Sequence, residues 1–445
     1  MSCHVQHLQS ATQILDLNGV RILTDPWLTE GEYHGSWFHY PPFPESKLAD
    51  LEYDYIYVSH IHPDHLSEKT FKHLPHKKPV IIHKFKSVFL KRKIESFGFE
   101  VIECENAEKF FFDSDSFIQI FAADNCDPEL CGKFFGCADL EIDYSKTNID
   151  TLALFSSGDK RILNLNDCPF ELAKAAILAN KLDEEIDLLL VGYAGAGPYP
   201  QCFTFSSLEE KKKAIEGKEK QFICQAVNFV KLIRPKQFMP FAGTYILGGK
   251  LHTLNVSRGV PNIQLALANI EIEVGTLSQG VLLQQREVLD LNNNSKDASL
   301  VLSHPSFDEF MNRISTLPYD YENNLDVDED VLDENMALAY ERFLKMANGI
   351  GFTTQTRVMF SFGQDEEYVF SMTESPQKLP VKDIKPLEKE PFVRIALDVR
   401  LLDLLLKGPR YAHWNNAEIG SHLHFERVPD VFERGLYHCL YFFHR

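Results

Sequence analysis

The sequence lacks the long hydrophobic run that a membrane helix needs. None of its apolar stretches approaches about 18 to 20 uninterrupted residues, and Met1 to Ser10 lack the charged-then-apolar pattern of a signal peptide. The nine cysteines are odd in number and scattered, which makes a poor disulfide framework. These absences predict a cytoplasmic protein that does not contact a membrane.

Positive charge is also in the minority. The 45 Lys and Arg residues stand against 64 Asp and Glu residues, giving a formal net charge of -19. Because phosphate backbones are bound mainly by Lys and Arg, this balance argues against an extended nucleic-acid partner. It leaves room for a local basic pocket that binds one small phosphorylated ligand.

The 445 residues are enough for two or three domains at about 150 residues per domain. The first half alternates short apolar runs with longer segments, and Asn18-Gly19 predicts a β-hairpin turn. We expect a helix over 208–232, a strand over 237–241 and a strand pair near 270–288.

A polar, turn-rich stretch at 291–296 predicts the domain boundary. We therefore expect one domain over 1–290 and a smaller α+β domain over 291–445, with a helix near 331–347. The second domain is a candidate for homodimer or partner-protein contacts.

The most informative residues are 59–66, Ser-His-Ile-His-Pro-Asp-His-Leu, directly after a predicted strand. Side chains alternate along a strand, so His60 and His62 can point the same way, and a turn at Pro63 can bring Asp64 and His65 to the same place. Imidazole and carboxylate groups bind Zn²⁺, so the run predicts a site for one or two ions. Such an ion generates hydroxide from water near neutral pH. Asp64 is the candidate catalytic base or water-orienting group, and a purely structural ligand is the alternative.

This run resembles the signature of the metallo-β-lactamase fold superfamily. The likeness extends to a strand that ends at Asp25 and to a second strand that ends at Asp167. The resemblance implies an αββα sandwich over the first domain, with Asp25 orienting the metal loop and Asp167 as a further metal ligand.

Within the superfamily, the chain is similar to ascorbate-6-phosphate lactonase-like proteins and to the catalytic domain of CMP-N-acetylneuraminate hydroxylase-like proteins. Asp-Pro-Trp-Leu at 25–28, Gly-Ser-Trp-Phe at 35–38 and Met-Pro-Phe-Ala-Gly at 239–243 carry the likeness to the hydroxylases.

Three departures from the family pattern bear on the metal. The third motif's histidine is missing from 118–127, where Asp124 or Asp127 is a candidate replacement. The fifth motif's histidine is missing near 241, with His252 the nearest candidate downstream. Extra carboxylates make iron or manganese alternatives to zinc. The Cys-x-His and Cys-x2-His pair of a Rieske domain is absent from the sequence, so an oxygenase of this kind needs a separate electron donor.

Candidate substrate-binding residues lie on two loops. Trp37 could form an apolar lip over a ligand, although packing against the core is an equally simple interpretation. The Gly-rich stretch from Tyr193 through Tyr199 could approach an anionic ligand through its backbone, or it could be a plain turn.

These residues lead to three hypotheses. The first is a metal-dependent hydrolase that acts on a phosphorylated or nucleotide-linked small molecule through metal-activated water. The second is an iron mono-oxygenase resembling the sugar-nucleotide hydroxylases. The third is a non-catalytic, metal-stabilised subunit of a larger complex.

Overall fold

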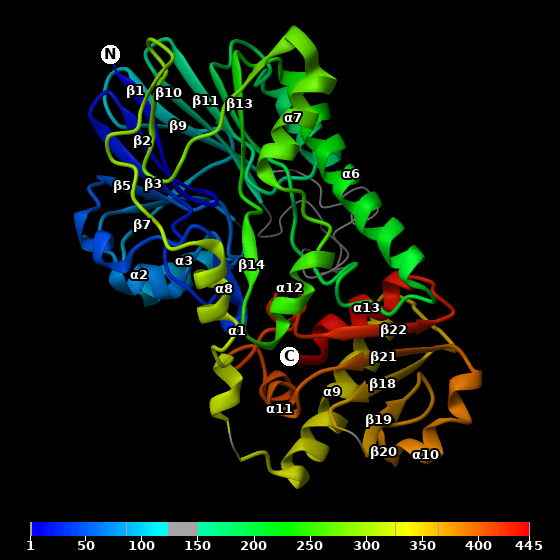
Figure 1. The fold of residues 1–445 in the computed structure, drawn as a ribbon. Helices are drawn as coiled ribbons and strands as arrows, with labels where there is room; N and C mark the ends of the chain where they lie inside the picture. The colour runs from blue at the N-terminus through cyan, green and yellow to red at the C-terminus, as the bar shows by residue number, and fades with distance from the viewer. Residues whose placement is uncertain (1, 86, 123–149, 325, 364, 445) are drawn as a thin grey trace.

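The computed structural model describes residues 2–85, 87–122, 150–324, 326–363 and 365–444. Within them, the chain forms two large sheets packed face to face, followed by a smaller domain built on a third sheet (Figure 1). None of the helices in the described part of the chain has the length and apolar character needed to span a bilayer.

The first sheet is mixed and has eight strands among the described residues. Their spatial order is β17 (Ser295–Asp297), β16 (Val288–Asp290), β1 (Cys3–Gln9), β2 (Thr12–Leu17), β3 (Val20–Thr24), β5 (Tyr55–Tyr57), β6 (Val80–His83) and β7 (Val101–Cys104). The Asn18-Gly19 hairpin is confirmed, because Leu17 pairs with Val20 and both turn residues have positive φ.

The second sheet has seven strands in the same described ranges. Their order is β15 (Gln279–Gly280), β13 (Gln237–Phe241), β12 (Leu188–Gly192), β11 (Lys160–Asn164), β10 (Thr151–Ser157), β9 (Ser116–Ala122) and β8 (Lys109–Phe111). A short ribbon pairs β14 (Tyr245–Leu247) with β4 (Trp37–His39).

One hydrophobic core lies between the two sheets and joins side chains of both, such as Leu15 and Ile22 with Phe155 and Ile162. Helices cover the outer faces. Those of the first sheet are α2 (Glu68–His73) and α3 (Phe89–Ser96), and those of the second are α5 (Phe170–Ala179), α6 (Leu208–Ile233) and α7 (Ile263–Val274). The predicted αββα sandwich is confirmed.

The strand pair predicted near 270–288 is wrong in its first part. The alternation Ile-Glu-Ile-Glu-Val at 270–274 suggested a strand, but these residues end helix α7. Asn262 caps that helix through its side chain, and the buried residues Ala266, Ile270 and Val274 recur every four positions. The helical period therefore prevails, and Ile272 remains exposed.

The smaller domain is α+β, as predicted. Its sheet runs β20 (Gln377–Pro380), β19 (Glu366–Phe370), β18 (Arg357–Ser361), β21 (Phe392–Ala396) and β22 (His424–Val428). Its helices are α9 (Glu329–Gly349), α10 (Val381–Ile384), α11 (Val399–Lys407), α12 (Trp414–Ile419) and α13 (Arg434–Tyr441). Helix α8 (Phe307–Ile314) packs on Phe38 of the first domain. The first sheet continues past residue 290 to Asp297.

The two domains are in direct contact. The chain around Phe203 pairs with β22, since Thr204 N donates to Phe425 O at 2.9 Å and Phe425 N donates to Cys202 O at 2.7 Å. The Trp37 indole also donates to the Ile419 carbonyl at 3.2 Å. Strand β22 and helix α13 consequently lie below the lower end of α6 (Figure 1).

Candidate metal centre and its cavity

The histidine-rich loop leaves β5 at the edge where several parallel strands end. Strands β3 and β5 run parallel, as do β11 and β12, so their carboxyl ends meet at one edge of the sandwich. The strand β10 is antiparallel to β11, which places its first residues at that same edge. Side chains far apart in the sequence therefore converge there.

Asp25 fixes the shape of this loop. Its carboxylate accepts hydrogen bonds from the Ser59 backbone at 2.7 Å and the Ser59 hydroxyl at 2.8 Å, and it contacts Nδ1 of His65 at 3.0 Å. A carboxylate bound to one imidazole nitrogen directs the other nitrogen toward a metal. The structure thus gives Asp25 the orienting position that the family resemblance implied.

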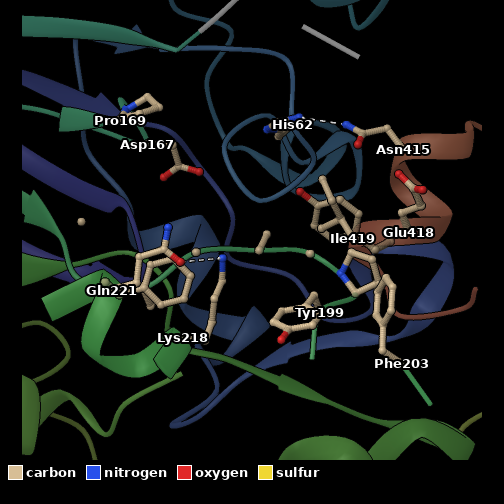
Figure 2. A pocket seen from close by; sticks show the side chains of 18 of the residues that line it. His62, Asp167, Pro169, Tyr199, Phe203, Lys218, Gln221, Asn415, Glu418 and Ile419 are labelled. Atoms are coloured by element: carbon tan, nitrogen blue, oxygen red, sulfur yellow. Dashed lines mark hydrogen bonds between the residues drawn. The ribbon is translucent and has the colours of Figure 1, made fainter. Parts of the chain in front are cut away.

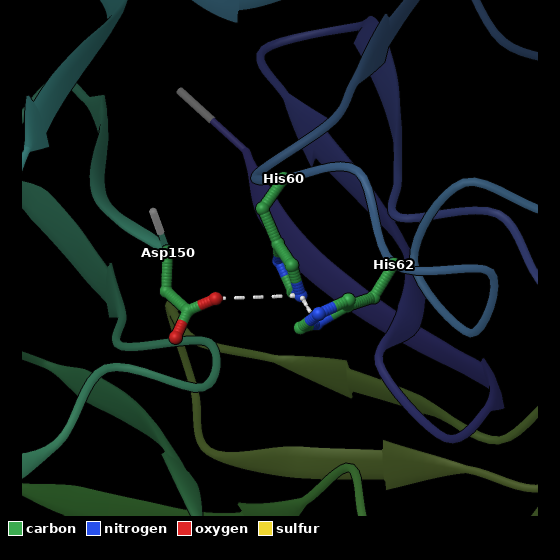
Figure 3. Close-up of side chains that lie close together, drawn as sticks. All are labelled: His60, His62 and Asp150. Carbon is green, nitrogen blue, oxygen red and sulfur yellow. Dashed lines mark hydrogen bonds and ion pairs between the residues drawn. The ribbon is translucent and has the colours of Figure 1, made fainter. Parts of the chain in front are cut away.

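Two overlapping groups of side chains could each bind a metal ion. One comprises His60, His62 and Asp150 (Figure 3), and the other His60, His65 and Asp167. In each group the potential ligand atoms lie within 4.8 Å of one another. His60 Nε2 lies 2.8 Å from His62 Nδ1 and 3.4 Å from a carboxylate oxygen of Asp150.

The surroundings of His65 fit a cation. Its Nε2 is buried without a hydrogen-bond partner, yet it faces carboxylate oxygens of Asp167 at 3.4 Å and Asp64 at 3.6 Å. Burial alone would lower the pKa of His65, but Asp167, Asp64 and Asp25 outweigh burial and raise that pKa well above its usual range. Positive charge is therefore favoured where this nitrogen points, as metal binding requires.

The pKa of His60 shifts in the opposite direction from that of His65. Burial lowers its pKa well below the usual range, and the nearby Asp150 carboxylate only partly opposes that effect. A neutral imidazole is the form that binds a metal ion. Nitrogen and carboxylate oxygen donors together suit zinc, iron or manganese, so the donor set fits the predicted metal.

Asp64 has a protein partner of its own. The buried Tyr33 hydroxyl donates a hydrogen bond to one of its carboxylate oxygens. Burial and the Asp64 charge raise the pKa of Tyr33 well above its usual range, so the tyrosine stays a hydrogen-bond donor. Asp64 thus keeps one oxygen held by Tyr33 and the other near His65.

A cavity of about 520 Å³ opens beside these groups, and His62, Asp64 and Asp167 line one part of it. Helix α6, the 194–199 loop and helix α12 of the smaller domain line the rest (Figure 2). This volume is typical of a site for a small molecule, and its position between two domains is a common one.

The smaller domain also contacts the metal loop. The side-chain amide nitrogen of Asn415, on α12, lies 3.2 Å from Nε2 of His62 (Figure 2). The other ring nitrogen of His62 faces His60. An amide at this point can fix the orientation of a metal-binding imidazole.

The predicted site residues divide into two sets. His60, His62, Asp64, His65 and Asp167 come together as expected, and Tyr199 lines the cavity. The residues that lie elsewhere are Trp37, Tyr193 and His252.

For these three residues the structure corrects the expectation. Trp37 is stacked on Tyr245 with ring centroids 3.6 Å apart, so it packs in a core instead of forming a lip. Tyr193 is buried in the core between the second sheet and the helices α5, α6 and α7. His252 directs Nδ1 to the Gly249 carbonyl within its own turn, at 2.9 Å, and belongs to neither metal group of the described residues. Asp124 and Asp127 lie outside the described residues.

Asp150 is a site residue that the sequence did not single out. It directly precedes strand β10, whose first residues lie at the edge of the sandwich where β3 ends before Asp25. The polar residues at 414–422 stand in an aromatic setting typical of a cavity cap or a dimer contact, but the contact of Asn415 with His62 depends on packing between the two domains.

Comparison with known proteins agrees with this geometry. Residues 4–115 match the family model described as Beta-lactamase superfamily domain. Together with the two packed sheets, that match decides the fold. The protein has the metallo-β-lactamase fold.

Sequence similarity to known proteins covers more of the chain than residues 4–115. Cytidine monophosphate-N-acetylneuraminic acid hydroxylase of Danio rerio is 26% identical over 234 residues, covering 51% of this metallo-β-lactamase-fold chain and 35% of the relative. Inactive cytidine monophosphate-N-acetylneuraminic acid hydroxylase of Homo sapiens is 22% identical over 466 residues, covering 99% of this chain and 84% of the relative.

Among solved structures, isothiocyanate hydrolase from Delia radicum gut bacteria superposes with a TM-score of 0.44 and 16% identity. The superposition covers 64% of this chain and 98% of that one.

Proposed function

We propose that this protein is a metal-dependent enzyme that hydroxylates a small molecule bound in the cavity between its domains. The observation that carries this proposal is the position of two overlapping donor groups beside that cavity. Three imidazoles and two carboxylates make up the groups, and the Asp64 carboxylate lies next to them.

The relatives favour hydroxylation over hydrolysis, and the mixed imidazole and carboxylate donors accept iron as well as zinc or manganese. Hydroxylation with dioxygen needs a redox-active metal, which zinc is not. Relatives from Macaca mulatta and Pongo pygmaeus, aligned over 99% of the chain, are named as hydroxylases. Iron is therefore our first choice of metal, with zinc or manganese as alternatives.

A bound metal ion would supply Lewis acidity and, if it is iron, one-electron chemistry with dioxygen. His60, His62 and Asp150 would bind in one group, and His65 and Asp167 in the other, together with Asp64.

The chain's own groups then have separate tasks. Asp25 holds Ser59 and His65 in place. Tyr33 holds one oxygen of Asp64, and the other oxygen lies 3.6 Å from Nε2 of His65.

Hydroxylation also requires an electron source. Converting R–H and O₂ to R–OH and H₂O consumes two electrons and two protons. The 445 residues hold no Rieske pair of the Cys-x-His and Cys-x2-His type, and we propose that a one-electron carrier protein, such as a reduced ferredoxin, supplies both electrons.

The direct test uses the compound in the relatives' names. The iron-loaded protein, a reduced ferredoxin and cytidine monophosphate-N-acetylneuraminic acid are incubated under isotopically labelled dioxygen. We expect a product that has gained one labelled oxygen atom, and we expect none with His62→Ala. A product carrying oxygen from labelled water would instead contradict hydroxylation.

Hydrolysis is the second candidate, because Asp64 lines the cavity with one oxygen held by Tyr33, a suitable arrangement for orienting water. In that case a zinc-loaded protein would cleave its substrate without consuming dioxygen, and the new oxygen would come from water. Metal binding without turnover of any kind would favour the non-catalytic subunit.

A further inference from the structure

We infer that Lys218 binds an oxyanion of the molecule that occupies the cavity, and that aromatic side chains around it contact an apolar or aromatic ring of the same molecule. This inference deepens the proposed function by naming the chemical class of ligand, and it rests on that function only in treating the cavity as the substrate site.

The first argument is the charge of the cavity wall. Besides Lys218, the acidic and basic side chains that line it are His62, Asp64, Asp167, Glu418 and Arg427. The first three belong to the metal end. Arg427 forms an ion pair with Asp430, with nitrogen and oxygen 2.5 Å apart, so its charge already has a partner.

Glu418 does not neutralise Lys218. The Glu418 side chain lies on α12, is only 2% exposed and has a buried oxygen without a hydrogen-bond partner. Burial raises the pKa of its carboxyl to about 8, so the group is mostly uncharged at neutral pH. The lysine is the remaining uncompensated charge among the described residues of this wall.

The second argument is the environment of the Lys218 amino group. It donates to the Gln221 amide oxygen at 3.3 Å and lies 4.7 Å from the centre of the Phe222 ring. Burial lowers its pKa, and no carboxylate of the described residues contributes to that shift. An ammonium group that is half-buried without a counter-ion favours an anionic ligand.

The Lys218 stem is also held in position. The backbone at Gly259 approaches so closely that a β-carbon there would lie 2.9 Å from the β-carbon of Lys218. Figure 2 shows the amino group directed from α6 toward the cavity, with Glu418 and Ile419 on a different wall. A pre-positioned charge loses less side-chain entropy when it binds.

The third argument is the aromatic surface nearby. Tyr199 and Phe203 meet edge to face at 5.3 Å, and Phe203 stacks on Phe425 at 4.9 Å. These rings line the same cavity, together with Phe222, Phe432 and Tyr437. Aromatic rings of this kind bind planar or apolar groups by stacking and edge contacts. The cavity therefore suits a molecule that combines an oxyanion with a ring.

The test is a binding titration that requires no turnover. The probes are 2-naphthalenesulfonate and the uncharged 2-naphthalenemethanol, whose fluorescence reports binding to the full chain. The variants are Lys218→Met, which keeps the length but removes the charge, Lys218→Arg, which keeps the charge, and Lys220→Met, an exposed control on the same helix.

We expect the wild type to prefer the sulfonate, and Lys218→Met to weaken sulfonate binding about tenfold, as for loss of one charge-assisted hydrogen bond. Lys218→Arg should restore most of the affinity, and Lys220→Met should leave it unchanged. The alcohol should bind all four proteins equally. Equal sulfonate binding by wild type and Lys218→Met, or no preference for the sulfonate in the wild type, would overturn the inference. Neither outcome depends on which reaction the enzyme catalyses.

Discussion

Asp150 belongs to one of the two donor groups, although no motif in the sequence marks it as a metal ligand. It is 3% exposed, and one of its carboxylate oxygens lies 3.4 Å from Nε2 of His60. In the sequence it immediately precedes β10. The antiparallel pairing of Thr151 with Ala122 brings the start of β10 opposite the end of β9. Asp150 therefore lies at the edge of the sheet where β9 ends.

Replacing this carboxylate should weaken metal binding. In Asp150→Asn, the amide keeps the shape of the side chain but loses the negative charge of the carboxylate that lies beside His60 and His62. We expect metal affinity to fall at least about tenfold, because even indirect contacts to ligands contribute that much. Chelator competition followed by elemental mass spectrometry measures the change. Asp159→Asn, at an exposed turn, is the control, and equal affinity in both variants would remove Asp150 from the site.

Glu418 should make stability depend on pH. Burial raises the pKa of its carboxyl from 4.5 to about 8 in the folded chain. Between those values the folded chain keeps a proton that the unfolded chain has released, so the free energy of unfolding falls as pH rises. Glu418→Gln has no such proton to lose, so its free energy of unfolding should not show this fall.

Chemical unfolding at about pH 5 and about pH 8 tests this linkage. We expect Glu418→Gln to gain stability relative to the wild type at the higher pH only. The exposed Glu334→Gln should show no such difference. A constant offset between wild type and Glu418→Gln at both values would mean that the carboxyl titrates normally.

At the scale of elements, helix α12 connects the smaller domain with the metal loop. Its Asn415 amide lies 3.2 Å from Nε2 of His62. If that contact fixes the imidazole, Asn415→Ala should reduce metal affinity by about 10- to 100-fold without removing a ligand. Asn416→Ala, one position along the same helix and absent from the cavity lining, is the matched control for the same chelator competition. The same loss in both variants would indicate damage to α12 in general.

Elements with strong local signals were predictable from the sequence. The helix expected over 208–232 is α6, Leu208–Ile233, whose Ser207 cap binds the Glu210 backbone. The helix expected near 331–347 lies within α9, and Asp328 caps it. Helix α7 was missed because five residues of alternating polarity fit a strand period equally well.

At the scale of the whole molecule, metal binding should be linked to stability. Four aspartates lie in or next to the two donor groups, at positions 25, 64, 150 and 167. Without a metal they repel one another in a chain whose net charge is already -19. At a free metal concentration about 100 times Kd, binding stabilises the folded state by about 2.7 kcal/mol.

We therefore expect a chelator to lower Tm by several degrees, and added iron, manganese or zinc to restore it. The measurement is a thermal melt with and without metal. Asp64→Asn should respond less than the wild type, whereas His252→Ala should respond equally, because His252 lies in neither metal group of the described residues. An unchanged melt after complete metal removal would contradict this linkage.

The fold and four of the five residues in the two donor groups could be predicted from the sequence alone. The His-x-His-x-Asp-His run is local, so its spacing after a strand specifies which side chains can meet. The remaining site residues come together only in the folded chain. Asp150 reaches the site through strand pairing, and Asn415, Glu418 and Lys218 meet at one cavity because two domains pack together. Such contacts join residues up to 353 positions apart, and no local pattern of polarity or turn residues encodes a distance across an interface.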